Sequence, residues 1–96
     1  MDVEFTWNPE KAKRNLAKHK VSFEAPRRAF TDPHLIVLED REDERGEMRY
    51  HAIGYAGPVL LLVVFADRSK GDREIIHIIS ARKADKYEQS SYADQF

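Results

Sequence analysis

Cysteine is absent from the 96-residue sequence, and long apolar runs are absent as well. Without cysteine there is neither a disulfide framework nor a thiolate metal site. The longest apolar run, residues 59–66, is far shorter than the roughly 20 residues that span a membrane. The acidic start, Met1-Asp2-Val3-Glu4, leads into no apolar stretch of signal-peptide length. These absences predict a cytoplasmic protein without membrane contact.

The sequence motifs of several enzyme classes are also missing. The chain has no Gly-rich phosphate-binding loop, no Gly-x-Ser-x-Gly turn and no His-Glu-x-x-His pair. Its four histidines, His19, His34, His51 and His77, lack the close spacing of metal-ligand motifs. The sequence therefore predicts neither a cofactor nor a bound metal.

The charges are distributed unevenly, although the net charge is only −1. Residues 1–30 contain seven Lys and Arg against four Asp and Glu, whereas residues 31–50 contain three against seven. One face of the protein can therefore attract phosphate while another repels it. The alternative is that both segments are simply solvated faces.

Two helices are predicted in the first third of the chain. Asn8-Pro9 is a helix-start signal, and the helix is expected to run to about His19. Ser22 is the predicted cap of a second, shorter helix that ends at Phe30.

Strands dominate the rest of the sequence, where apolar residues alternate or run without a break. The predicted strands are residues 4–7, 35–39, 48–55, 59–66 and 73–80, followed by a closing helix at residues 83–92. The last four strands are expected to pair in antiparallel succession. This order predicts one small α+β domain, residues 1–96, with helices grouped on a curled, mainly antiparallel sheet.

Lys18-His19-Lys20, at the end of the first predicted helix, is the first candidate site. Its two ammonium groups attract phosphate, and histidine suits proton transfer near neutral pH. Cations at this position also complement the helix dipole, which is the structural alternative.

Ser80-Ala81-Arg82-Lys83 is the second candidate site. Ser80 is predicted to cap the closing helix, which puts Arg82 and Lys83 in its first turn. Cations there oppose the helix dipole unless an anion binds nearby. This mismatch favours a phosphate-binding role for Arg82.

Three further residues each have two interpretations. Arg49 either contacts phosphate or pairs with Glu47 or Glu74 across strands. Trp7 either packs in the core or stacks on a nucleic-acid base. His77 alternates with isoleucines and is interpreted as a hydrogen-bonded core histidine rather than a catalyst.

Histidine, lysine and arginine are sufficient for RNA cleavage without a cofactor. A base removes the 2′-OH proton, the oxygen attacks the adjacent phosphorus, and an acid protonates the leaving 5′ oxygen. Cations offset the charge that accumulates on the phosphorane oxygens. Cleavage of this kind is expected to need no divalent metal ion.

The ordered set of residues resembles the BrnT toxin family, whose fold is a variant of the RelE-like ribonuclease toxins. The resemblance covers residues 5 to about 92. The matching positions are Phe5, Trp7, Lys11, Asn15, Lys18-His19, Val21 to Ala25, Phe30, Asp32-Pro33, Glu47, Arg49, Ile53-Gly54, Leu61 to Val64, Ile78 to Arg82, Ala84, Glu88 and Tyr92. Three residues depart from the family pattern: Asn8 replaces Asp, Lys20 replaces Gly, and Pro26 replaces a helix former.

The resemblance implies an mRNA-cleaving toxin of a type II toxin–antitoxin system. Its expected partner is a BrnA-like antitoxin with a ribbon-helix-helix part. The toxin is expected to contact operator DNA only indirectly, through this antitoxin. A hydrophobic patch beside the sheet is expected to accept an ordered segment of the antitoxin. The alternative function is a non-catalytic binding module or corepressor derived from a toxin.

The candidate catalytic group is expected to surround one phosphate, with His19 as the base and Arg82 as the group that stabilises the phosphorane. Its members are Lys18, His19, Arg49 and Arg82. The residues expected to bind RNA around it are Lys11, Lys83 and Trp7.

Overall fold

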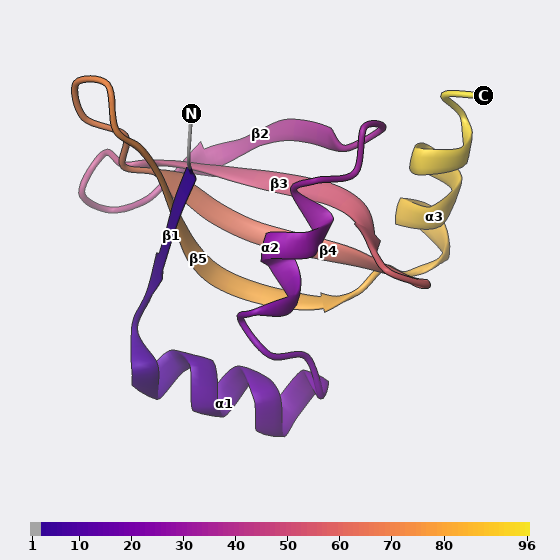
Figure 1. Cartoon of the computed structure of the whole chain (residues 1–96), viewed down its shortest axis with the longest axis horizontal. Coiled ribbons are helices and arrows are strands. Elements are labelled where there is room, and N and C mark those ends of the chain that lie inside the picture. The colour runs from indigo at the N-terminus through magenta and orange to yellow at the C-terminus, as the bar shows by residue number, and fades with distance from the viewer. Residues whose placement is uncertain (1–2) are drawn as a thin grey trace.

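In the computed structural model, which describes residues 3–96, three helices lie against one five-stranded sheet, with α2 over one face, α1 beside the sheet and α3 at one end (Figure 1). The elements are β1 (Val3–Trp7), α1 (Pro9–His19), α2 (Ala25–Ala29), β2 (Ile36–Glu42), β3 (Met48–Ala56), β4 (Val59–Asp67), β5 (Glu74–Lys83) and α3 (Lys86–Ala93). The strand order is β1-β5-β4-β3-β2, antiparallel from β2 to β5. The predicted α+β class is confirmed. The parallel pairing of β1 with β5 was not predicted.

The first helix begins and ends where the sequence predicts. The Asn8 side chain accepts hydrogen bonds from the backbone N–H groups of Glu10 and Lys11, and Pro9 occupies the first helical position. After His19, Lys20 adopts the left-handed conformation with φ of 61°. Because glycine adopts this conformation at lower cost, the lysine adds backbone strain at the turn.

The second helix begins later than predicted. Ser22 is not its cap, since α2 starts at Ala25 and the preceding Glu24 makes no side-chain capping bond. The reason is the core, because Val21 and Phe23 are both buried and hold this segment against the sheet in a non-helical path. The predicted end at Phe30 is confirmed.

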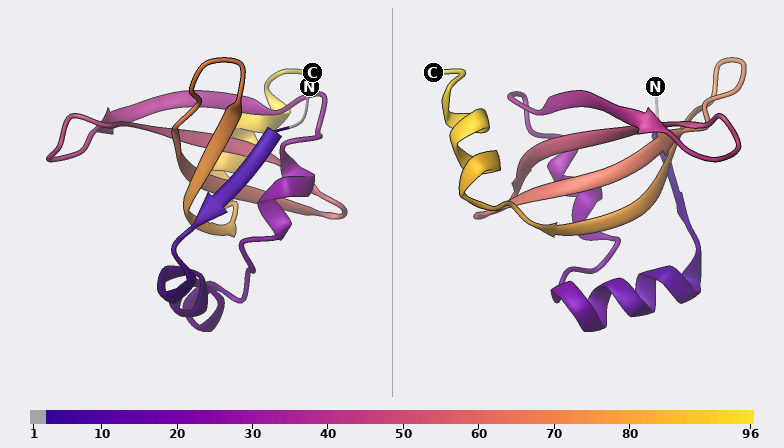
Figure 2. Two further views of the ribbon diagram at one scale, coloured as in Figure 1. Left: turned by 60° about the vertical axis from the view of Figure 1, so that its left-hand side comes forward. Right: turned by 180° about the vertical axis from the view of Figure 1, so that it is seen from behind.

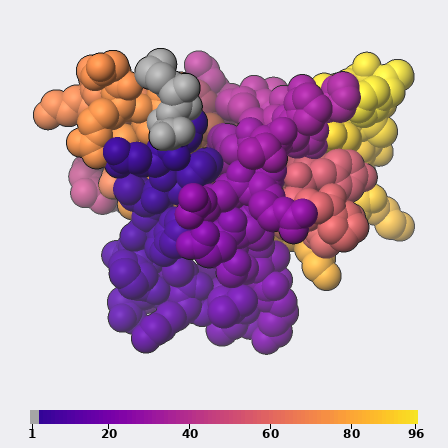
Figure 3. Space-filling view, viewed as in Figure 1, coloured from indigo at the N-terminus to yellow at the C-terminus, as the bar shows by residue number. Residues whose placement is uncertain are grey.

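The main core lies between the sheet and α2, with α1 beside it. Phe65 in β4 packs edge-on against Phe30, with 5.2 Å between ring centroids, and stacks on Tyr50 at 5.4 Å. Val63 and Ala81 are fully buried on the same side of the sheet. In the space-filling view, α2 lies over this side and α1 lies below it, beside the sheet (Figure 3). It is called the covered face below.

Gly54 allows α2 and the following loop to approach β3 closely. A Cβ atom at this position would lie 2.6 Å from Leu35 Cδ1 and 2.9 Å from the backbone oxygen of Ala29. The backbone oxygen cannot rotate away as a side chain can, so any larger residue would push α2 off the sheet.

The end of β5 corrects the predicted start of the closing helix. Residues 80–83 belong to the strand, because they pair with Leu61 to Val64 of β4. Ser80 is therefore not a cap. Asp85 caps α3 instead, in a capping box with Glu88. Arg82 and Lys83 thus lie on a strand and not in the first turn of a helix.

Asn15 joins α1 to the edge of β5, where β1 no longer covers it. Its amide accepts from the Ala81 N–H at 3.2 Å and donates to the Ala81 oxygen at 2.7 Å. A further bond to the oxygen of Val21 fixes the chain after the helix. The buried side chain therefore replaces a neighbouring strand and determines where α1 lies.

Candidate functional site

The face of the sheet opposite α2 carries most of the polar candidates. Successive strand residues point to opposite faces, so the neighbours of the core residues point away from α2. Seen from behind, this face is crossed by no helix except α3 at one end (Figure 2, right). We call it the open face. Its residues include Thr6, Arg49, His51, Val64, Ala66, His77, Ser80 and Arg82.

His77 in β5 is held by β1. The Thr6 Oγ1 and His77 Nδ1 atoms lie 2.8 Å apart. Burial, followed by the positive charge of Arg68, lowers the pKa of His77, and Lys11 adds to the effect. The ring is therefore neutral near pH 7. When Nδ1 donates to Thr6, Nε2 is an acceptor, and among residues 3–96 it has no hydrogen-bond partner.

Glu47 and Arg68 form an ion pair close to His77. The Arg68 Nε and one terminal nitrogen donate to the two Glu47 oxygens, both at 3.1 Å. The hydrogen bond from Arg68 lowers the pKa of Glu47, even though burial opposes the effect. A carboxylate held in this way stays ionised and is a poor proton acceptor.

Arg49 and His51 extend from β3 over the same face. Arg49 pairs with Asp43 at 3.8 Å, so the interpretation that it pairs with Glu47 or Glu74 is wrong. Its Nε is buried and has no partner within the described residues. His51 Nε2 lies 3.2 Å from an oxygen of Asp40. Both side chains are partly exposed and keep unused hydrogen-bonding capacity toward solvent.

Arg82 lies at the other end of the open face. Two of its terminal nitrogens donate to the two oxygens of Glu88 in α3, at 2.8 and 2.7 Å. The bond to Glu88 raises the pKa of Arg82. The carboxylate also neutralises much of its charge, so a phosphate must share this guanidinium with α3.

The end of α1 lies near the segment of β5 that contains Arg82, and the proximity of Lys18 and His19 to Arg82 stays a prediction. The bonds from Asn15 to Ala81 place the last turns of α1 beside this part of β5. On the helical wheel, Lys18 shares the side of Lys11, whereas His19 shares the half-buried side of Ala12. Lys11 also lies close enough to influence His77.

The structure does not bring Arg49 to this group. Arg82 pairs with Leu62, which pairs with Ile53, four residues from Arg49 along β3. Standard strand dimensions convert this offset to roughly 13 Å along the strands and 10 Å across them. Arg49 lies instead in one row with Ala66 and His77.

Two residues expected to bind RNA point to the covered face. Trp7 packs edge-on against Phe23, with 6.2 Å between ring centroids. Lys83 pairs with the buried Leu61 and therefore points the same way. Trp7 thus has the core role that was its alternative interpretation.

Sequence reasoning overlooked His51 and His77 as a pair on one face. The strand spacing of Arg49 and His51 puts them on the same side of β3, and that signal was present in the sequence. The contact between His77 and Thr6 was not available, because it requires the parallel pairing of two strands that are 71 positions apart.

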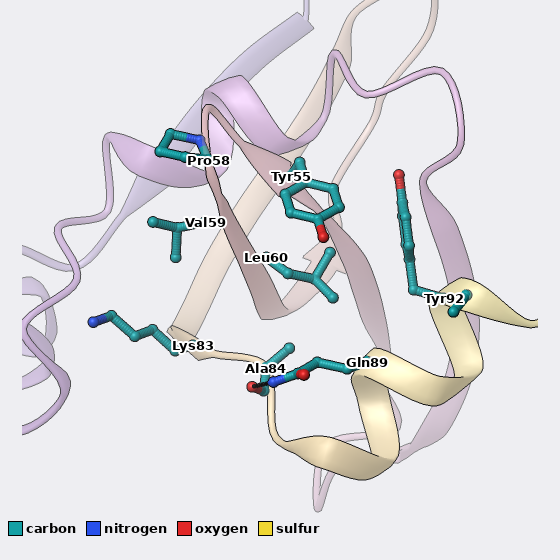
Figure 4. Close-up of a pocket in the computed structure, with 9 residues that line it drawn as sticks. Tyr55, Pro58, Val59, Leu60, Lys83, Ala84, Gln89 and Tyr92 are labelled. Atoms are coloured by element: carbon teal, nitrogen blue, oxygen red, sulfur yellow. Dashed lines mark hydrogen bonds between the residues drawn. The ribbon is translucent and has the colours of Figure 1, made fainter.

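A recess of about 540 Å³ lies between α3 and the turn that joins β3 to β4 (Figure 4). Its polar groups are Lys83, Gln89 and two tyrosines, Tyr55 and Tyr92. Tyr92 donates to Asp32 at 2.7 Å, and this bond raises the pKa of Tyr92 to about 12. The phenol is therefore no acid or base near neutrality. The recess otherwise presents mainly apolar side chains, among them Val59 and Leu60.

Within residues 3–96, no three histidine or acidic side chains are grouped so that they could hold a metal ion. In the same part of the chain, no helix has both the length and the apolar character needed to cross a membrane.

Comparison with known proteins identifies the family. Residues 7–88 match the family model described as a ribonuclease toxin, BrnT, of type II toxin-antitoxin systems. The chain belongs to the BrnT family. No curated protein matches it. The part that matches the BrnT model runs from the end of β1 into α3 and contains Arg49, His51, His77 and Arg82. A type II toxin has an antitoxin as its partner.

Proposed function

We propose that this member of the BrnT family cleaves RNA on the open face of its sheet. The observation that carries the proposal is the row formed by His77, Ala66 and Arg49. It places a neutral histidine and a partly unpaired guanidinium two strands apart, or roughly 10 Å between backbones. Ala66 between them is fully buried, so a phosphate is contacted by the ends of the His77 and Arg49 side chains that flank it.

The proposed reaction begins at His77. Its free Nε2 accepts the proton of a 2′-OH, and the oxygen forms a bond to the adjacent phosphorus. The bond to the 5′ oxygen breaks, leaving a 2′,3′-cyclic phosphate and a 5′-OH after protonation. Arg49 offsets the charge on the phosphorane through its terminal nitrogens, of which Nη2 lies 3.8 Å from Asp43, whereas its buried Nε takes no part. His51, two residues along β3, supplies the proton to the leaving oxygen.

Cations at the other end of the face bind the flanking phosphates. Arg82 and Lys18 stand at the end of β5, and Lys11 stands near His77. RNA lying along β5 contacts these cations in turn, so the phosphate contacts follow the first helix. In this arrangement His19, on the side of Ala12, takes no part in proton transfer.

Substitution of single histidines tests this assignment. His77→Gln is expected to lower the single-turnover cleavage rate of a fluorescent RNA oligonucleotide by about 100-fold, the usual contribution of a general base. His34→Gln, at an exposed loop position, is the matched control, and circular dichroism checks folding. His19→Gln decides between the two candidate bases. A large loss in His19→Gln with full activity in His77→Gln would move the site to the end of α1.

A chelator provides a second test of the mechanism. Because side chains carry out both proton transfers, cleavage should persist in excess EDTA with an unstructured RNA substrate. Loss of cleavage that magnesium restores would contradict the mechanism. If the wild-type chain cuts no RNA under any of these conditions, the role of a binding module is favoured.

We also propose that the partner is a BrnA-like antitoxin with a ribbon-helix-helix part. The family description supports an antitoxin, and the acidic β2–β3 segment makes direct DNA binding by this side of the chain unfavourable. The complex should retard operator DNA in a gel, and the chain alone should not. Retardation by the chain alone would contradict this role for the antitoxin.

A further inference from the structure

We propose that the antitoxin anchors an acidic amphipathic segment in an apolar groove on the covered side, next to α1. This inference rests on the toxin–antitoxin function proposed above and adds the docking surface and its chemistry. The groove is formed by two adjoining recesses of about 330 and 230 Å³. Leu16 and Ser22 line both recesses, so Leu16 forms the ridge between them.

The groove offers apolar surface from several elements. On one side of Leu16 lie the half-buried Trp7 and the buried Phe23, and on the other lie the half-buried Val59 and the buried Leu61. Leu16 itself is 49% exposed on a helix that is otherwise mostly polar. A contiguous apolar surface of this kind is stabilised when a partner removes it from water.

The charges around the groove indicate the chemistry of the partner. Lys13, Lys20 and Lys83 line it, against one acidic residue, Glu24. This local excess of positive charge contrasts with the net charge of −1 for the chain. A segment with apolar side chains on one face and carboxylates along its edges matches both features. In particular, Lys20 is held in place, since its Nζ donates to the Ala17 oxygen at 3.1 Å.

The groove does not suit RNA. It opens on the side of the sheet opposite His77. The ring of Trp7 is packed against Phe23, so it is not free to stack on a nucleotide base. Few of its side chains besides the lysines can hydrogen-bond to a nucleotide. Antitoxin anchoring and RNA cleavage are therefore assigned to different faces.

A path connects the groove to the open face. Val59 and Lys83 line both the groove and the recess beside α3. In Figure 4 these two side chains lie at the end of that recess away from Tyr92. An anchored partner chain can continue through the recess toward α3, which holds Arg82 through Glu88. This route links the anchor to the cations proposed to bind RNA.

The test uses Leu16→Glu in the full chain, with the product of the adjacent reading frame as the probe. The charge and the lost apolar contact should weaken binding by more than 30-fold in calorimetry. Leu38→Glu is the matched control, since Leu38 is 51% exposed on β2, away from the groove. The affinity of Leu38→Glu for the antitoxin should change by less than threefold. Without the antitoxin, Leu16→Glu should cleave RNA at the wild-type rate.

A charge reversal tests the acidic character of the partner. Lys13→Glu combined with Lys20→Glu should weaken binding at least tenfold at low salt, and the difference should shrink as salt rises. Wild-type affinity in Leu16→Glu or in this double variant would overturn the docking proposal. Failure of the cleavage proposal is a separate result, because His77→Gln changes the cleavage rate and leaves the groove intact.

Discussion

The covered face and the open face are made by the same strands and differ only in which alternate residues they receive. Phe65 and Ala81 point toward α2, whereas their neighbours Ala66 and Arg82 point the other way. Phe65, Ala81 and Ala66 are buried, and only Arg82 reaches solvent. The buried cluster of the covered face is apolar, and a smaller apolar cluster of Ile53, Leu62 and Tyr92 joins the open face to α3. On the open face, charged groups pair with one another: Arg68 with Glu47, Arg82 with Glu88, and His51 with Asp40.

This difference separates stability from chemistry. Burial of apolar area contributes most of the favourable free energy of folding, so the covered face should determine stability. Partly exposed ion pairs contribute little, because water already solvates the separated charges. The open face is thus free to carry residues chosen for phosphate and proton transfer. Substitutions on the two faces should therefore separate folding from cleavage.

The largest effect is expected at Phe65. Phe65→Ala removes a ring that packs on both Phe30 and Tyr50, and it should lower the free energy of unfolding by about 3–5 kcal/mol. Chemical denaturation measures the change. Val64→Ala, next in sequence but on the open face, is the control and should cost about 1 kcal/mol. Equal losses would show that the two faces do not differ in the way described.

A somewhat smaller effect is expected at Asn15. Asn15→Ala leaves the N–H and oxygen of Ala81 and the oxygen of Val21 without their partner, a loss of about 2–3 kcal/mol. Asn15→Asp should not restore stability, because a carboxylate cannot donate to the two oxygens. Arg14→Ala, at the exposed neighbouring position, should change the free energy of unfolding by less than about 0.5 kcal/mol.

These two positions also show what the sequence could predict. Local patterns were sufficient for α1, for the strands and for their antiparallel order, since each depends on alternation and turn signals within a few residues. The role of Asn15 was not predictable, because its partner Ala81 is 66 positions away. The same applies to the end of β5, where pairing with β4 overrides the helix-start signal read at Ser80.

The site was predicted in part for the same reason. Lys18 and Arg82 were predicted to lie together; the bonds of Asn15 bring α1 to Ala81, next to Arg82, and the position of the Lys18 side chain stays a prediction. Arg49 was assigned to the same point, but strand register sets it four residues along β3 from Ile53, the residue in line with Arg82. Register depends on the whole sheet, so single residues cannot reveal it.

The pH dependence of stability gives a smaller effect on the open face. Because burial lowers the pKa of His77 in the folded chain, the unfolded chain binds a proton first as pH falls below about 6.5. Stability should therefore decrease from about pH 6.5 down to the folded pKa. His77→Gln should remove this part of the decrease in denaturation curves taken at several pH values, whereas Phe65→Ala should keep it.

Lys11 offers a direct way to change the pKa of His77. Its positive charge contributes to the lowered pKa, after burial and Arg68. Lys11→Gln should raise the pKa of His77 and move the acidic limb of the cleavage profile to higher pH. Lys13→Gln, on the other side of α1, is the control and should leave that limb in place. An unchanged limb in Lys11→Gln would argue against His77 as the base.

The smallest effect is expected at the exposed ion pair of Arg73 and Glu4. One terminal nitrogen of Arg73 donates to both carboxylate oxygens of Glu4 at 2.8 Å, and its Nε adds a bond at 3.1 Å, so the contacts are nearly as short as those of Arg82 and Glu88. The side chains of Arg73 and Glu4 are nevertheless 64% and 48% exposed, so water competes for both charges. A double-mutant cycle with Arg73→Ala and Glu4→Ala should give a coupling of about 0.2–1 kcal/mol that falls in high salt. A coupling as large as the loss in Asn15→Ala would mean that charges at the edge of the sheet stabilise the fold. The short hydrogen bonds of the pair would then contribute more than its solvent exposure allows, and the claim that the covered face determines stability would be wrong.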